Sequence, residues 1–258
     1  MKANKKLLAS AMALGLAGLT TVGSTYAWFS MNRTVSATNM QVKATTPASL
    51  VISSSKNMSE NKTSISYGTA TNELAPATHD HTEQFNSTNL KYVKNATDVD
   101  PKTGLVNSPV YEVATNTGSV KYYVDYTCYI ASSGSELTNQ DLKASLYTNA
   151  DVTEDTHKAI SVDFYVATVD TDTLGTYVST LNLSTLDAAN HESKAPATII
   201  TAGSIPMANG ETHFVRIDMR VYFDGDLKNT AGNAYVRNDG VNTDTVTFGV
   251  KFTTSDHA

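Results

Sequence analysis

Apolar and polar residues alternate with a period of two in several stretches of the chain. In the clearest, residues 213–223, the apolar positions on one face are Val215, Ile217, Met219, Val221 and Phe223. The positions on the other face include Arg216, Asp218, Arg220 and Tyr222. The same alternation runs through residues 120–130, 161–169 and 245–253. Because successive side chains of a strand point to opposite faces, each stretch predicts a β-strand with one face in the core.

Weaker patterns predict further strands at 40–53, 142–147, 174–181 and 199–206, and a short helical turn within 181–190. Pro47 interrupts the first of these or places it at a sheet edge. Strands separated by Gly, Asn, Asp and Ser turns predict one all-β domain, residues 28–258, folded as an antiparallel β-sandwich. Residues 53–107 are poor in apolar side chains and are expected to form a loop-rich insertion with one hairpin.

The first 27 residues have the pattern of a secretory signal peptide, which would form an N-terminal helix. Lys2, Lys5 and Lys6 precede the uncharged, apolar residues 7–22, and small residues follow, with Thr25 and Ala27 at positions −3 and −1. Cleavage between Ala27 and Trp28 is therefore predicted. An uncleaved anchor helix is the alternative, but residues 7–22 are fewer than the roughly 20 that span a bilayer. We expect a secreted protein that meets signal peptidase and the membrane only before cleavage.

The cleavage region resembles that of the TasA/camelysin family, exported proteins of Gram-positive bacteria that a SipW-type signal peptidase cuts. The resemblance rests on Gly23-Ser24-Thr25-Tyr26-Ala27-Trp28-Phe29 and, after a short polar run, on Val35-Ser36-Ala37-Thr38-Asn39-Met40-Gln41-Val42. It covers about residues 5–45. The resemblance implies a jelly-roll β-sandwich. It also implies subunits that assemble into extracellular fibres of the biofilm matrix, each lending its N-terminal strand to the next.

On this resemblance, residues 28–36 are the predicted donor strand of a homopolymer. Phe29, Met31 and Val35 share one face of an extended segment, and Arg33 interrupts that face. Trp28 and Phe29 are the expected anchors, since burying an aromatic side chain contributes roughly 1.5–3 kcal/mol. Packing of the segment on its own domain, as an edge strand, remains the alternative. We therefore expect a structural protein and no enzymatic activity.

Two other functions remain open at this point. A monomeric secreted adhesin or carbohydrate-binding module would use the loops of residues 53–107 and the many Tyr, Asn and Thr side chains. A secreted metal-dependent peptidase would need a set of metal ligands. Tyr123, Tyr129 and Tyr222 fall on polar strand faces, which predicts half-buried sheet residues or, alternatively, a contact surface.

Charge and cysteine content narrow the choice of partners. Removing residues 1–27 removes three lysines and no acid, which leaves 16 basic and 25 acidic residues and a formal net charge of −9. This acidic balance argues against nucleic acid and anionic membrane surfaces as partners. Cys128 is the only cysteine, so no intrachain disulfide forms, and its strand position predicts a small buried apolar side chain.

Candidate metal ligands are present but poorly arranged. His191-Glu192 lacks the second histidine of a His-Glu-x-x-His zinc motif. His79-Asp80-His81-x-Glu83 has no further identified ligand and is predicted to be a solvated loop. For calcium, the candidates are Asp98–Gly104, Asp170-x-Asp172 and Asp224-Gly225-Asp226, all of which are more typical of turns. We expect no cofactor, with calcium as the one ion left open.

Overall fold

The protein has an all-β fold. The computed structural model describes residues 35–44, 50–58, 64–67, 72–79, 85, 90–93, 111–116, 121–149, 151–152, 155–208, 213–224 and 245–258. Its strands are β1 Val35–Ala44, β2 Leu50–Ser53, β3 Ser64–Ser66, β4 Asn72–Leu74, β5 Pro76–His79, β6 Leu90–Val93, β7 Tyr111–Val113, β8 Tyr123–Ser132, β9 Leu137–Thr148, β10 Ile160–Val166, β11 Thr176–Asn182, β12 Ala197–Ile205, β13 Val215–Asp224 and β14 Thr245–Asp256. Within these ranges, the helical elements are one turn of α-helix, α2 Asp155–Lys158, and a 3₁₀ turn, η1 Leu183–Thr185.

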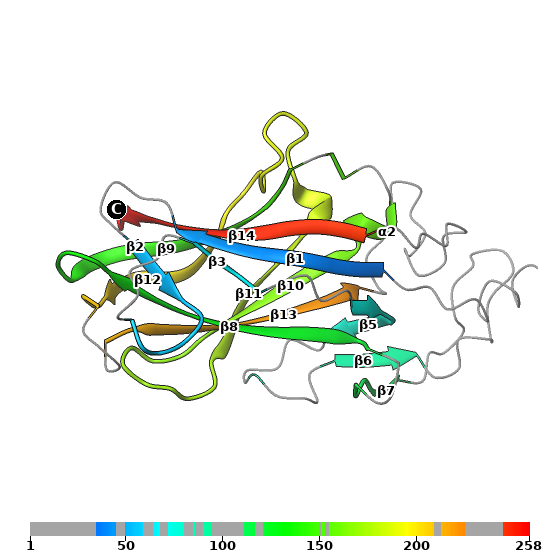
Figure 1. The fold of residues 1–258 in the computed structure, drawn as a ribbon, viewed down its shortest axis with the longest axis horizontal. Helices are drawn as coiled ribbons and strands as arrows, with labels where there is room; N and C mark the ends of the chain where they lie inside the picture. The colour runs from blue at the N-terminus through cyan, green and yellow to red at the C-terminus, as the bar shows by residue number, and fades with distance from the viewer. Residues whose placement is uncertain are drawn as a thin grey trace, which may run out of the picture.

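The strands form two sheets. Sheet A has the order β12-β9-β14-β1-β3, with β4 also paired to β1. Sheet B has the order β11-β10-β13-β5-β6-β7, with β8 paired to β13 and β2 paired to β8. Figure 1 shows β14 and β1 side by side along the upper part of the molecule, with β13 and β8 below them.

One large hydrophobic core lies between the two sheets. Sheet A contributes Met40 and Val42 from β1 and alternate residues of β9 and β14, and sheet B contributes alternate residues of β8, β10 and β13. The rings of Phe164 on β10 and Phe252 on β14 meet edge to face across it, 6.4 Å between centroids. Burying one such ring contributes roughly 1.5–3 kcal/mol, so the sheets are held together mainly by this layer.

The strand predictions with the strongest alternation are confirmed. All five apolar residues predicted for the inner face of residues 213–223 lie in this core, as do Val246, Phe248, Val250 and Phe252 of β14. Cys128 is fully buried, and burial raises the pKa of its thiol well above the usual range. The weaker predictions correspond to β9, β11 and β12, and the helical turn to η1.

Two sequence predictions are wrong in detail. The strand predicted at 40–53 is two strands, β1 in sheet A and β2 in sheet B, with Pro47 in the interval between them. The sheets are not purely antiparallel, because β1 pairs in parallel with β14 and β5 with β13. The described part of residues 53–107, which were expected to form loops with one hairpin, includes the short strands β3 to β6. The β5–β6 pair is such an antiparallel hairpin.

The predicted signal peptide, residues 1–27, lies outside the described residues. Among the residues that are described, no helix has the length and apolar character needed to cross a membrane.

Candidate functional site

Strand β1, the first described strand, lies beside β14, the last described strand, in sheet A. It runs parallel to β14, from Ser36 opposite Thr245 to Ala44 opposite Phe252. Met40 and Val42 point into the core, where 2% and 0% of their surface is exposed. Since each buried apolar side chain of this size contributes roughly 1.5–3 kcal/mol, the middle of β1 is well anchored in its own domain.

Among the described residues, the edge of β1 opposite β14 pairs with two short strands, β3 and β4. β3 pairs with β1 at Gln41, Val42 and Lys43, and β4 pairs with Val35, Ser36 and Ala37. Each strand has three residues, so the first part of β1 is held on this side by three residue pairs.

Gly249 of β14 lets the backbone of β1 approach closely. The ladder between the strands shifts between Thr38 and Gln41, and Gln41 lies opposite Gly249. A Cβ atom at position 249 would lie 2.5 Å from the backbone oxygen of Gln41 and 2.5 Å from Cζ of Tyr147. Only glycine lets the β1 backbone and the Tyr147 ring approach this closely.

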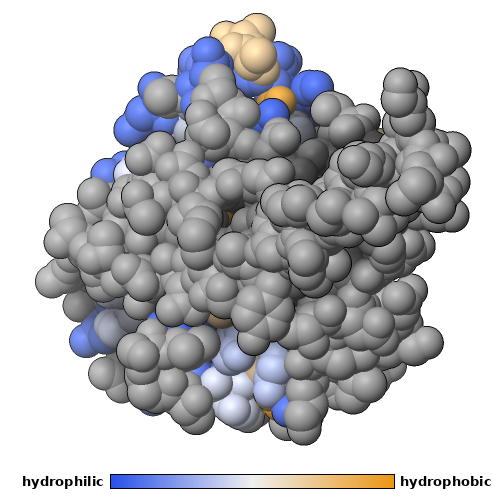
Figure 2. Space-filling view, turned by 90° about the vertical axis from the view of Figure 1, so that its right-hand side faces the viewer, coloured by the Kyte–Doolittle hydropathy of each residue, from blue (hydrophilic) through white to orange (hydrophobic). Residues whose placement is uncertain are grey.

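Most of the predicted donor strand lies outside the described residues, including the cleavage pair Ala27 and Trp28 and the side chains of Phe29, Met31 and Arg33. The exceptions are Val35 and Ser36, the first two residues of β1, which pair with Leu74 and Glu73 of β4 in their own chain. Figure 2 looks onto the end of the molecule at which β1 begins, and its coloured residues are mainly hydrophilic.

The outer face of sheet B is the second candidate region. The residues predicted for the polar face of β13 do point away from the main core, but they are covered: Asp218, Arg220 and Tyr222 are 0%, 1% and 1% exposed. Tyr129 is also buried, and Tyr123 is half-buried. The contact-surface interpretation is thus wrong for Tyr129 and Tyr222, because segments distant in sequence lie over them.

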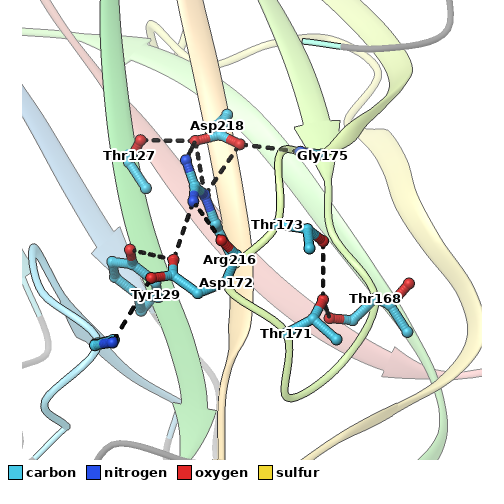
Figure 3. Close-up of polar contacts among 10 residues, drawn as sticks. Thr127, Tyr129, Thr168, Thr171, Asp172, Thr173, Gly175, Arg216 and Asp218 are labelled. Atoms are coloured by element: carbon cyan, nitrogen blue, oxygen red, sulfur yellow. Dashed lines mark hydrogen bonds and ion pairs between the residues drawn. The ribbon is translucent and has the colours of Figure 1, made fainter.

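One part of this face is a polar network around Arg216 (Figure 3). The guanidinium of Arg216 donates hydrogen bonds to the carboxylates of Asp172, at 3.0 Å, and Asp218, at 3.0–3.2 Å. Thr127 Oγ1 and the backbone N–H of Gly175 also donate to Asp218. This network fixes the 168–175 loop against β13 and β8.

The same network uses the carboxylates of the calcium candidate Asp170-x-Asp172. Asp172 also accepts a hydrogen bond from the hydroxyl of Tyr129, and burial raises the pKa of that hydroxyl to about 12. Asp170 accepts the backbone N–H of Phe214 and lies 3.3 Å from Nδ1 of His213. Protein donors therefore occupy the oxygens that a calcium ion would need.

Next along β13, Arg220 lies between two aromatic rings. Its guanidinium carbon is 4.1 Å from the ring centroid of Tyr123 and 4.7 Å from that of Phe85. Two hydrogen bonds of 2.8 Å join it to the carboxylate of Asp125. Cation–π stacking and a two-point carboxylate bond together hold this charge under the insertion.

A third group surrounds His79 of β5, whose imidazole is fully buried. Its Nδ1 lies 3.3 Å from Oδ2 of Asp163, and its Nε2 forms a 2.8 Å hydrogen bond with the hydroxyl of Tyr165. Thr180 and Tyr222 donate to the other carboxylate oxygen of Asp163. Burial raises the pKa of Asp163 to about 7. The prediction of a solvated loop at His79 is wrong, because the residue belongs to a strand docked on sheet B.

The remaining metal candidates are used in ion pairs or fall outside the described ranges. Glu192 makes two 2.9 Å contacts with Lys251, and His191 lies 3.2 Å from Asp151. In the part of the chain that the structure describes, no three His, Cys, Asp or Glu side chains are grouped as metal ligands. Asp80, His81, Glu83 and the 98–104 segment are not described.

The sequence did not predict that His79 is buried against Asp163 or that the ring of Phe85 packs on Arg220. No local signal marks either residue, because each contacts strands that are far away in the sequence. Compared with models of protein families and with curated proteins, the chain matches none.

Proposed function

We propose that the protein is a secreted structural subunit that polymerises into extracellular fibres by donating its N-terminal residues to a neighbouring subunit. The observation that carries the proposal is the position of β1. It is built into the domain between β14 and two short strands, and it begins at Val35, directly after the apolar residues predicted to be donated. The jelly-roll topology that the family resemblance implies belongs to the same proposal, supported by the two-sheet fold.

The position of β1 divides the N-terminal segment into an anchored part and a donated part. In this proposal β1 anchors the N-terminal segment in its own domain, and residues 28–34 are the part that a neighbouring subunit receives. Seven extended residues span about 23 Å, enough to cross to a neighbour and pair along one of its strands. Backbone hydrogen bonds then give affinity, and Phe29 and Met31 enter apolar positions of the neighbour. Such a head-to-tail contact does not close and so produces open filaments.

The test uses the mature chain, which begins at Trp28. Phe29→Ser combined with Met31→Ser should reduce fibre mass, measured by sedimentation and electron microscopy, by roughly tenfold or more, since two apolar anchors are lost. The matched control is Ser30→Ala with Asn32→Ala, which changes the alternate positions and should leave assembly near the wild-type level. Equal fibre mass for both variants would overturn the proposal, and a protein that stays monomeric throughout would favour the adhesin.

Trp28 provides a second measurement, because it is the only tryptophan in the chain. Its fluorescence emission should shift to shorter wavelength as fibres grow, since donation moves the indole from water into the neighbour. Fibres whose Trp28 emission stays that of an exposed indole would exclude residue 28 from the joint.

A disulfide tests whether β1 itself stays in its own sheet. Gln41 and Ser66 are exposed and directly opposite each other in the antiparallel β1–β3 pair. Directly opposed positions of this kind meet the distance requirement for a disulfide. Gln41→Cys with Ser66→Cys should form fibres equally well oxidised and reduced. Fibres formed only after reduction would show that the whole of β1 is exchanged.

A further inference from the structure

Residues Asn72–His79, here called the clasp segment, connect the two candidate regions. At one end, β4 pairs with Val35, Ser36 and Ala37 at the start of β1 in sheet A. At the other end, β5 pairs in parallel with Phe223 and Asp224 of β13 in sheet B. Eight consecutive residues thus bridge the base of the predicted donor strand and the buried His79–Asp163 pair.

The described side chains of the clasp segment are packed against the domain. Leu74 is fully buried in the main core, and Ala77 is 2% exposed in a second cluster with Leu90, Ala114 and Tyr222. Between them, the backbone N–H of Ala75 donates a 2.7 Å hydrogen bond to the carbonyl of Lys121. The two ends of the clasp segment are therefore joined by a short stretch whose described side chains are packed against the domain.

The His79 end is held by polar groups that water does not reach. Asp163 is 0% exposed, and its Oδ2 accepts no well-aligned hydrogen bond from the described residues, although His79 Nδ1 lies 3.3 Å away. Ser161 Oγ, two residues earlier on the same strand face, is likewise buried without a hydrogen-bond partner in the described structure. Buried polar atoms that lack full satisfaction carry a large free-energy cost, so this end is sensitive to its charge state.

Several other titratable or charged groups face the His79–Asp163 pair. Their charges do not offset the free-energy cost of burying an ionised Asp163 carboxylate. They come from every neighbouring strand: Asp125 of β8, Tyr165 of β10, Tyr177 of β11, and Arg220, Tyr222 and Asp224 of β13. Burial makes the largest contribution and raises the pKa of Asp163, and Asp224 also raises it, while Arg220, which hydrogen-bonds to Asp125, lowers it.

We propose that the clasp segment is a proton-controlled latch on the donor strand. When docked, it pairs with Val35, Ser36 and Ala37 on the edge of β1 opposite β14; when released, it leaves that edge, which begins at Val35, open to a neighbouring subunit. This inference rests on the proposed function, since the donor strand is the part it controls. Val35 is the third apolar residue of the predicted donor face, so the edge that release opens begins at that face.

The direction of the pH effect follows from burial. The docked state raises the pKa of Asp163 from 3.8 to about 7, so the docked state binds a proton that the released state has lost. The stabilisation of the docked state is complete below the ordinary pKa and declines as the pH rises from about 4 to about 7. The docked state of the clasp segment is accordingly more stable at pH 5 than at pH 8.

Hydrogen exchange of the mature monomer tests the latch without requiring fibres. After correction for the intrinsic rate, protection of residues 35–37 and 72–79 should fall by roughly tenfold or more between pH 5 and pH 8. Asp163→Asn, which keeps the size and removes the titration, should show no such fall. The matched control is Asp141→Asn, which alters an acid that lies 2.9 Å from His257 at another part of the molecule, and it should behave as the wild type.

His79→Gln is a second variant that keeps hydrogen-bonding groups at this position. It should lower the protection of residues 35–37 at both pH values. Protection that does not change with pH in the wild type, or a change that persists in Asp163→Asn, would overturn the latch.

Assembly rates then separate the two proposals. Light scattering should show faster growth at pH 8 than at pH 5 for the wild type, and equal rates for Asp163→Asn. Absence of fibres at both pH values, with the expected exchange behaviour, would leave the latch and remove the fibre function. Fibres together with pH-independent exchange would leave the function and remove the latch.

Discussion

The two faces of β13 are both buried, yet they are made of opposite kinds of residues. One face carries Val215, Ile217, Met219, Val221 and Phe223 into the core between the sheets. The other carries Arg216, Asp218, Arg220 and Tyr222, of which the last three are at most 1% exposed. A charged strand face is usually a solvated one, so its burial here requires specific partners from other segments.

The two faces of β13 differ in what they require from the rest of the chain. The apolar face needs neighbours of suitable volume, which any well-packed opposite sheet supplies. The polar face needs particular donors and acceptors: the 168–175 loop for Asp218, Asp125 and Phe85 for Arg220, and His79 and Asp163 for the Tyr222 end. Loss of volume and loss of a partner should therefore differ in their cost.

The largest effect is expected for Asp218→Ala. It leaves the Arg216 guanidinium, the Gly175 N–H and the Thr127 hydroxyl without their common acceptor in a buried place. Removing one partner of a buried charge pair costs about 4 kcal/mol in the free energy of unfolding, measured by urea denaturation of the mature chain. Asp218→Asn, which keeps the shape and one acceptor oxygen, should cost clearly less. Equal losses for the two variants would show that packing, not charge pairing, holds this face.

On the apolar face, Ile217→Ala should reduce the free energy of unfolding by about 3 kcal/mol, because it removes buried methyl groups and leaves a cavity. Ile217 is fully buried in the core. Ile217→Val, the matched control, should cost about 1 kcal/mol in the same urea experiment. A loss for the alanine variant that exceeds that of Asp218→Ala would reverse the order of the two faces.

The smallest effect is expected at the edge of the polar network. Lys56 Nζ lies 3.9 Å from Asp172, and the two side chains are 50% and 40% exposed. Lys56→Ala should change the free energy of unfolding by less than about 0.5 kcal/mol, and by still less in high salt. A loss above 1 kcal/mol, insensitive to salt, would mean that the network extends further toward solvent than its exposure indicates.

The alternation in β13 and β14 was sufficient to predict the inner face of each strand, because the period of two is a local property of the backbone. The partners of those strands were not predictable in the same way. Parallel pairing of β1 with β14 joins residues more than 200 positions apart in the chain, and no residue of β1 marks that choice. The short strands β3 to β6 were missed because three or four residues carry too little periodic signal.

The site shows the same division. The donor residues Phe29 and Met31 follow from the sequence pattern, and their role remains a prediction. The His79–Asp163 contact could not be predicted, because it joins a residue of the insertion to a core strand. In the sequence, His79 lies in a polar stretch together with His81. Its burial is explained by the docking of β5 on β13.

The register of β1 against β14 has a consequence for the uniformity of a polymer. A slip of β1 by one residue would move Met40 and Val42 from the core to the outer face. Gly249, opposite Gln41, lets the two backbones approach closely in the register that is observed. Every copy of the protein therefore begins β1 at the same point of its sheet. In a polymer of identical copies, this fixed register of β1 would keep the repeat distance constant from one end of the filament to the other.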